Sequence, residues 1–144
     1  MRKLVDILKQ PKLDKSLVQN VACCLGRVVN LYPTALANED LEKILKNWCI
    51  SLMYIKSKEE KISAYRGFCK VAPNSLEAIR KEFPFMCSSF NKFKNPPPDL
   101  EDTFKQILAA FKEKVVSQSQ EQWNSYLRTF PESLVNDLQN RFEI

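Results

Sequence analysis

A short helical pattern of apolar and small residues occurs three times along this chain at nearly constant spacing. Its copies occupy residues 17–26, 62–69 and 102–108. With Ala22, Ala64 and Phe104 taken as equivalent positions, the steps between copies are 42 and 40 residues. Tandem repeats of two helices recur every 40 to 47 residues or so, and the spacing therefore predicts a stack of helix hairpins.

The chain contains only two glycines, Gly26 and Gly67, and both lie inside helical patterns. Tight β-hairpin turns depend on glycine, so a sheet has little support. A glycine inside a helix costs about 1 kcal/mol relative to alanine, which indicates that these positions let neighbouring helices approach closely. We therefore expect an all-α fold, an α-solenoid of HEAT-type antiparallel hairpins, in preference to a helical domain without repeats.

Apolar spacing and helix-boundary residues divide the chain into eight helical segments. A short one covers residues 4–8, and its first turns are expected to precede Met1. Longer helices are expected near residues 14–32, 38–55, 59–71, 76–93 and 99–115, followed by two shorter ones. The helix at 14–32 is expected to bury Leu17, Val21, Cys24, Leu25 and Val28.

These helices group into a single solenoid fragment, residues 1–144. Residues 1–33 are expected to hold part of an outer helix and a complete inner helix. Residues 34–73 and 74–117 are expected to form one repeat each, and residues 118–144 a terminal capping hairpin. Pro84 lies inside a helix, where the missing backbone N–H predicts a kink.

Two segments resemble a known family. The run Trp48-Cys49-Ile50-Ser51-Leu52, followed by Glu-Glu-Lys-Ile-Ser-Ala-Tyr-Arg-Gly-Phe-Cys at residues 59–69, is similar to the C-terminal repeats of the transportin group of nuclear import receptors, in the importin-beta family. The likeness extends to residues around both ends of the chain. These residues are Asn20, Ala22, Gly26, Arg27, Trp123, Phe130 and Pro131.

The resemblance implies a receptor that wraps around protein cargo with a proline-tyrosine nuclear localisation signal and releases it when Ran-GTP binds. It also implies nucleoporins as partners of the full-length receptor, and shuttling between cytoplasm and nucleus. In that family Ran is held mainly by N-terminal repeats, so Ran is not expected to bind this segment. The second helix of each pair faces the cargo groove.

Carried over by position, Asn20 and Cys23 on an inner helix and Ile55 at the end of an outer helix are the expected cargo-peptide-binding residues. The family pattern favours a bulkier aliphatic residue where this chain has Cys23. The residues alone leave alternatives open. Asn20, Cys23, Arg27 and Asn30 share a helix side that is either a binding strip or a plain solvated surface, and Ile55 either lines a groove or closes its helix against a neighbour.

The chain lacks histidine, the commonest metal ligand and general base. Its five cysteines show no Cys-x-x-Cys spacing, so we expect no enzyme, no metal and no cofactor. An odd number of cysteines spread over helices favours a reducing compartment. No apolar run approaches the roughly 18 residues that indicate a membrane span, so no membrane partner is expected.

The net charge of +5 comes from 22 basic and 17 acidic side chains. The basic residues are dispersed among acidic neighbours, which favours a solvated surface over a specific nucleic-acid site. A second hypothesis remains for the function. In it, the chain is a HEAT scaffold that binds another protein or nucleic acid through a basic convex surface.

Overall fold

A computed structural model describes residues 1–12, 14–116 and 119–144. Within these residues it contains α-helices and two short 3₁₀ helices, and no strand. The elements are α1 (Arg2–Leu8), α2 (Lys15–Leu31), η1 (Pro33–Ala35), α3 (Asn38–Met53), α4 (Lys58–Val71), η2 (Ala72–Asn74), α5 (Leu76–Lys92), α6 (Pro98–Val116), α7 (Gln120–Leu127) and α8 (Glu132–Arg141).

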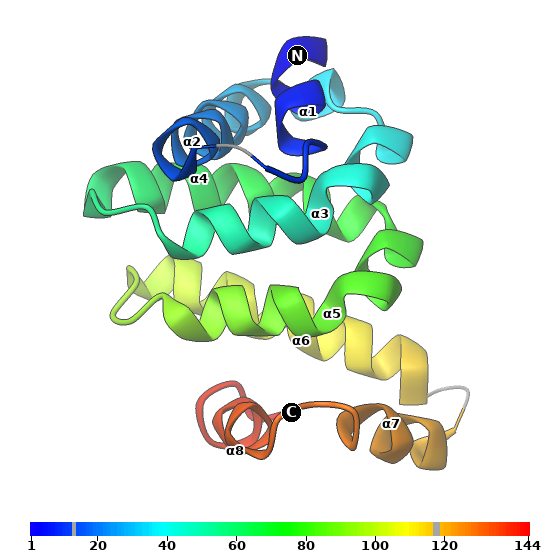
Figure 1. The fold of residues 1–144 in the computed structure, drawn as a ribbon. Coiled ribbons are helices and arrows are strands. Elements are labelled where there is room, and N and C mark those ends of the chain that lie inside the picture. The colour runs from blue at the N-terminus through cyan, green and yellow to red at the C-terminus, as the bar shows by residue number, and fades with distance from the viewer. Residues whose placement is uncertain (13, 117–118) are drawn as a thin grey trace.

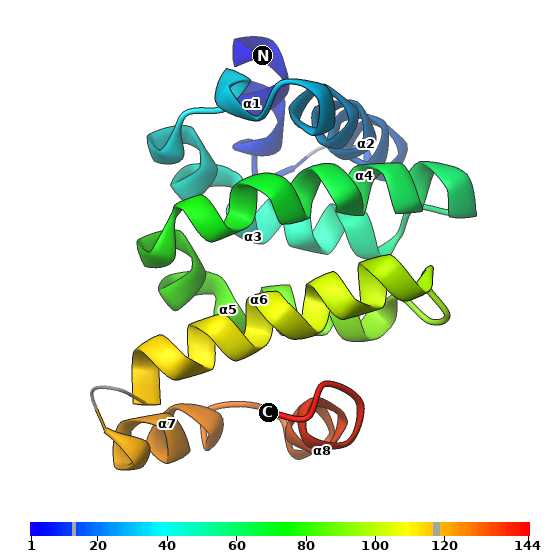
Figure 2. The same ribbon diagram turned by 180° about the vertical axis from the view of Figure 1, so that it is seen from behind.

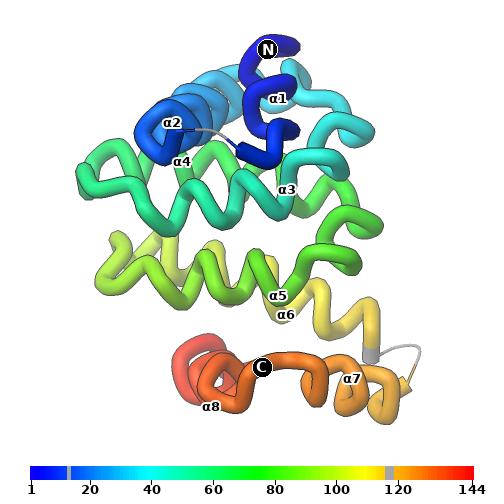
Figure 3. Tube along the Cα trace, in the orientation of Figure 1, coloured from blue at the N-terminus to red at the C-terminus, as the bar shows by residue number. Residues whose placement is uncertain are grey.

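The helices lie in two layers that run down the molecule (Figures 1 and 2). One layer contains α1, α3 and α5, and the other contains α2, α4 and α6, with contacts between successive helices of each layer. Helices α3 and α4 run antiparallel, as do α5 and α6, and Figure 3 shows the chain descending hairpin by hairpin. The prediction of an all-α HEAT-type solenoid is confirmed.

Helix boundaries follow local chemistry that recurs from hairpin to hairpin. The Asp14 carboxylate accepts hydrogen bonds from the backbone N–H groups of Ser16 and Leu17, at 2.9 and 3.1 Å, and so caps α2. Ser57 caps α4 in the same way. Pro33 and Pro73 each lie in the 3₁₀ turn that follows α2 or α4, where proline cannot continue the helix.

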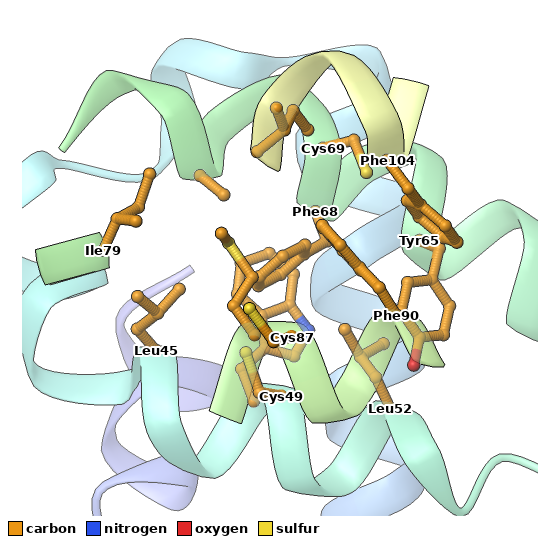
Figure 4. Close-up of a cluster of buried hydrophobic side chains, with 14 of the residues drawn as sticks. Leu45, Cys49, Leu52, Tyr65, Phe68, Cys69, Ile79, Cys87, Phe90 and Phe104 are labelled. Atoms are coloured by element: carbon orange, nitrogen blue, oxygen red, sulfur yellow. The ribbon is translucent and has the colours of Figure 1, made fainter. Parts of the chain in front are cut away.

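Aromatic side chains fill the space between the two layers. Trp48 is fully buried, and its indole Nε1 donates a hydrogen bond to the carbonyl oxygen of Ala22 at 3.1 Å. Phe68 meets Trp48 edge to face with ring centroids 5.1 Å apart, and Phe90 stacks on Phe104 at 4.1 Å. Figure 4 shows Phe68, Phe90 and Phe104 together in this core. Such packing joins α3, α4, α5 and α6 into one body.

Helices α2 and α4 touch backbone to backbone. A Cβ added to Gly26 would lie 2.6 Å from the Cα of Ala64, and one added to Gly67 would overlap the carbonyl oxygen of Gly26. Real Cβ atoms do not approach backbone atoms so closely, so both positions require glycine. The expected close approach at the two glycines is therefore present, between these two inner helices.

The buried side of α2 agrees with the expected one only in part, at Val21 and Leu25. Leu17 is 43% exposed, Cys24 is exposed and Val28 is half-buried, whereas Ala22 and Val29 are completely buried. The physical reason is the contact with α4, because close backbone packing selects small residues such as Ala22 and Gly26 for the interface. A stripe predicted from large apolar side chains does not include Ala22 and Gly26, which are buried at this interface.

The last hairpin before the C-terminal helices is bent where expected. Glu82, two residues before Pro84, has non-helical angles of φ −114° and ψ 16°, and this break divides α5. Beyond α6, helix α7 packs against α6 and helix α8 packs against α5. Figure 1 shows α8 nearly end-on while α7 runs across the view, so the two helices point in different directions.

Candidate functional site

A hollow of about 290 Å³ lies where the N-terminal half of α2 meets the turn between α3 and α4. All three residues expected from the resemblance, Asn20, Cys23 and Ile55, line this hollow. We call it the α2–α4 hollow. Its complete lining is Ser16, Gln19, Asn20, Cys23, Ile55, Lys56, Ser57 and Glu60. Residues from α2, from the turn after α3 and from the start of α4 thus meet at one place on the layer formed by α2, α4 and α6.

Ile55 and Cys23 form the apolar floor of the hollow. Ile55 directly follows the C-cap of α3, and its backbone N–H donates to the carbonyl oxygen of Leu52 at 3.4 Å. Its side chain is 6% exposed, so it packs against the core and also lines the hollow. The two roles considered for Ile55, closing its helix and lining a groove, are therefore compatible.

Cys23 occupies a different position from the expected one. It was placed on an exposed strip of α2, but its side chain is only 6% exposed. The first turn of α4 covers it, and its thiol Sγ donates a weak hydrogen bond to the carbonyl oxygen of Glu60 at 3.9 Å. Burial raises the pKa of the Cys23 thiol, with Arg27 acting in the opposite direction. Cys23 is consequently a neutral, apolar group at the bottom of the hollow.

The edge of the hollow is polar. Asn20 is exposed, and its amide offers both donors and an acceptor. Glu60 forms an ion pair with Arg27 at 3.8 Å, and Lys56 adds an opposite charge to the edge. An apolar floor with a polar, charge-balanced edge suits an apolar side chain of a peptide whose main chain is hydrogen-bonded at the surface.

Comparison with known proteins finds no matching family model. Transportin-1 from Homo sapiens is 34% identical over 131 residues, which is 91% of this chain. Importin subunit beta-2 from Schizosaccharomyces pombe is 31% identical over 108 residues, or 75% of the chain. This chain is a transportin homologue. It spans 14% of the length of human transportin-1 and 12% of that of the yeast protein.

Most of the hollow in this transportin homologue was not expected from the sequence. Ser57 has a recognisable signal, because it precedes Glu59 and Glu60 as an N-cap serine does. No sequence signal marks Gln19, Lys56 or Glu60 as residues of the hollow, because they meet only through the packing of α2 on α4. Arg27, expected on the same strip as Asn20, is exposed and directed to Glu60.

In the part of the chain that the structure describes, no three histidine, cysteine or acidic side chains come together as metal ligands would. The cysteine thiols are free, with Cys24 exposed and the other four buried. Among the helices of residues 1–12, 14–116 and 119–144, none is both long and apolar enough to cross a membrane.

Proposed function

We propose that this chain is the C-terminal cargo-binding portion of a transportin-like nuclear import receptor, and that its α2–α4 hollow binds proline-tyrosine type localisation signals. The observation that supports this most is the meeting of Asn20, Cys23 and Ile55 in one hollow. Homology to transportin-1 and importin subunit beta-2 supports the class of protein. A transport receptor needs no catalytic group, in keeping with a role that is not enzymatic.

In the proposed complex the apolar part of the signal occupies the hollow. One aliphatic side chain rests on Cys23 and Ile55, while the Asn20 amide hydrogen-bonds the peptide main chain. Cysteine is smaller than the aliphatic residue that the family pattern favours, so the floor leaves room for a larger peptide side chain. The basic part of the signal binds elsewhere, because this edge has no surplus of acidic groups.

The remaining partners belong to the full-length receptor. Nucleoporins and Ran-GTP act on the complete solenoid, and cargo moves with it between cytoplasm and nucleus. Ran is held outside this segment, so the isolated chain is proposed to bind cargo peptide without responding to Ran-GTP.

The test is a fluorescence-anisotropy titration with a labelled proline-tyrosine signal peptide that includes its apolar N-terminal part. We expect saturable binding that changes little between low and physiological salt, because apolar contact dominates. Ile55→Asp should weaken binding at least tenfold by placing a charge in the floor. Asn20→Trp should weaken it similarly by filling the hollow from an exposed position, without disturbing the core.

Leu76→Asp is the matched control, because Leu76 is an exposed aliphatic residue on α5, outside the hollow. Circular dichroism of each variant reports whether the helices remain folded. Binding that is unchanged in both Ile55→Asp and Asn20→Trp would show that the peptide does not use this hollow.

A further inference from the structure

Two adjoining hollows, of about 170 and 290 Å³, lie along the C-terminal half of α6. Phe111 lines both of them, and the start of α5 forms a wall of each. Helix α7 contacts α6 and closes one end, as Figure 2 shows below the C-terminal part of α6. We call the two hollows together the α6 groove, with Ile107, Phe111 and Val115 as its floor.

The floor of the α6 groove is apolar and fixed in position. Ile107 and Phe111 are 9% and 4% exposed, and Val115 packs against the core. Phe111 stacks on Phe83 of α5 with ring centroids 4.2 Å apart. The three floor residues follow each other at intervals of four positions, so they form one stripe about 12 Å long on a single side of α6.

The walls add apolar surface that the rest of the described chain leaves uncovered. Leu76, the first residue of α5, lines the groove and is 45% exposed. Tyr126 of α7 forms the end wall, and its hydroxyl donates a hydrogen bond to the carbonyl oxygen of Arg80 at 3.0 Å. A partner that covers Leu76 and the floor therefore gains apolar burial without a rearrangement of these walls.

The edge of the α6 groove is basic. Arg80 and Lys114 line it, and in the part of the chain that the structure describes no carboxylate is among the lining residues. Arg80 is exposed, and its guanidinium has no ion-pair partner within the described residues. Glu77, three positions away on α5, is paired with Lys81 at 3.9 Å. The groove thus complements an apolar ligand that also carries negative charge.

A helix suits this groove better than an extended peptide does. The backbone groups of α5 and α6 along the groove are used within these helices, so an extended peptide would find few partners for its own main chain. A helix satisfies its main chain internally. Its side chains at i and i+4 lie one turn apart, which matches the spacing of Ile107, Phe111 and Val115.

We propose that the α6 groove docks an amphipathic α-helix of a partner protein. In the docked complex, aliphatic side chains one turn apart on the partner helix meet the floor. Acidic side chains beside them pair with Arg80 and Lys114. This site shares no lining residue with the α2–α4 hollow and is independent of the function proposed for that hollow.

Three synthetic helical peptides test the proposal in anisotropy titrations with the complete chain. The acidic peptide has leucines at i, i+4 and i+7 with glutamates beside them, the basic peptide has lysines in place of the glutamates, and the polar peptide has serines in place of the leucines. We expect the acidic peptide to bind saturably, about tenfold more tightly than the basic one, and the polar peptide not to bind. Arg80→Glu should bring the acidic and basic peptides within about threefold of each other.

Ala110→Trp places a large side chain in the groove from an exposed position and should weaken binding of the acidic peptide at least tenfold. Ala109→Trp is the matched control, because the neighbouring alanine is also exposed but lies outside the groove, and it should bind within about twofold of the parent. Circular dichroism reports whether both variants remain folded.

An acidic peptide that does not bind the parent chain would overturn the proposal. Equal binding of the acidic and basic peptides, or of the acidic and polar peptides, would overturn it as well, because the proposed partner is defined by both its charge and its leucines. Binding of the acidic peptide that is unchanged in Ala110→Trp would show that it docks elsewhere. Selective loss in Ala110→Trp, with loss of the charge preference in Arg80→Glu, is the result that supports the proposal.

Discussion

Two glycine positions determine how the inner helices of this solenoid meet. Gly26 and Gly67 allow α2 and α4 to touch through their backbones. The same approach places the Cys23 thiol against the carbonyl oxygen of Glu60 and so creates the floor of the α2–α4 hollow. The α2–α4 hollow therefore depends on residues that have no side chain of their own.

The first prediction concerns Gly67→Ala. Glycine to alanine ordinarily stabilises an exposed helix interior by about 1 kcal/mol. Here the new Cβ would overlap the Gly26 carbonyl, so α2 and α4 must separate, and we expect a loss of about 2 kcal/mol or more. Urea denaturation measures the free energy of unfolding. Ala109→Gly, on the exposed side of α6, is the control and should show the ordinary preference for alanine. A Gly67→Ala variant as stable as the parent would contradict the close contact.

The reactivity of the five cysteine thiols depends on whether each is buried or exposed. Burial raises the pKa of Cys49, Cys69 and Cys87 far above the ordinary value of a thiol. Nearby groups raise two of these pKa values further, Glu82 that of Cys49 and Cys49 that of Cys87. Figure 4 shows these three cysteines within the aromatic core. Cys24 is exposed. Because only accessible thiolates react, the five cysteines should differ widely in reactivity.

The second prediction is a thiol titration with Ellman's reagent at pH 8. One thiol, that of Cys24, should react rapidly, Cys23 should react slowly, and the remaining three should react only as the protein unfolds. Cys24→Ser should remove the rapid phase and leave the others unchanged. Rapid reaction of two or more thiols in Cys24→Ser would contradict the described burial.

The raised thiol pKa values also predict a pH dependence of stability. Above pH 9 the thiols of the unfolded chain lose protons while the buried ones keep theirs, so the folded state binds more protons and the free energy of unfolding falls as pH rises. Below pH 9 this contribution is fully present. Lys61, whose pKa burial lowers, acts in the opposite direction, but it is one group against the four buried thiols. Urea midpoints at pH 8 and pH 10 measure the change, and a higher midpoint at pH 10 would contradict it.

At the scale of elements, the sequence predicted α3 well and α2 less well. Helix α3 lies between neighbours on both sides, and its large apolar residues, such as Ile44 and Trp48, are fully buried as expected. Helix α2 makes its closest contact through Gly26, and periodicity based on large side chains cannot identify such an interface. Periodicity also fails to predict that Cys23 is buried, because its burial depends on a turn of α4 that is distant in sequence.

Besides the packing of α8 on α5, one arginine of α8 makes several hydrogen bonds to the stack. The Arg141 guanidinium makes a bidentate ion pair with Glu101 at 2.8 and 2.9 Å. It also donates to the carbonyl oxygens of Asn91, in the last turn of α5, and of Phe93, the C-cap of that helix, at 2.8 and 2.7 Å. These carbonyls lack helical partners, so one side chain satisfies the end of α5 and joins it to α6 and α8.

The third prediction concerns Arg141→Lys. An ammonium cannot form the planar fork that reaches Glu101 and two carbonyls at once, so we expect a loss of about 1 to 3 kcal/mol in the free energy of unfolding. Hydrogen exchange should also become faster in α8. Arg128→Lys, at an exposed position after α7, is the control and should change stability by less than about 0.5 kcal/mol. Equal stability of the two variants would mean that Arg141 does not anchor α8.

At the scale of the whole molecule, the spacing of the repeated pattern was enough to predict a two-layer solenoid, because each hairpin needs neighbours to cover its apolar surface. Neither the α2–α4 hollow nor the α6 groove follows from spacing. The α2–α4 hollow needs the exact approach of two inner helices and the turn at Ile55, and the sequence contributed Asn20, Cys23 and Ile55 only through resemblance to a family. Their placement around one hollow comes from the three-dimensional arrangement.

The most direct measurement is photo-crosslinking of a proline-tyrosine signal peptide with a diazirine-containing leucine analogue in its apolar part. After irradiation, mass spectrometry identifies the crosslinked residues. Crosslinks to Asn20, Cys23, Ile55 or their neighbours around the α2–α4 hollow are the predicted result, with loss of signal when unlabelled peptide competes. Specific crosslinks confined to the layer formed by α1, α3 and α5, away from Ile55, would contradict the account.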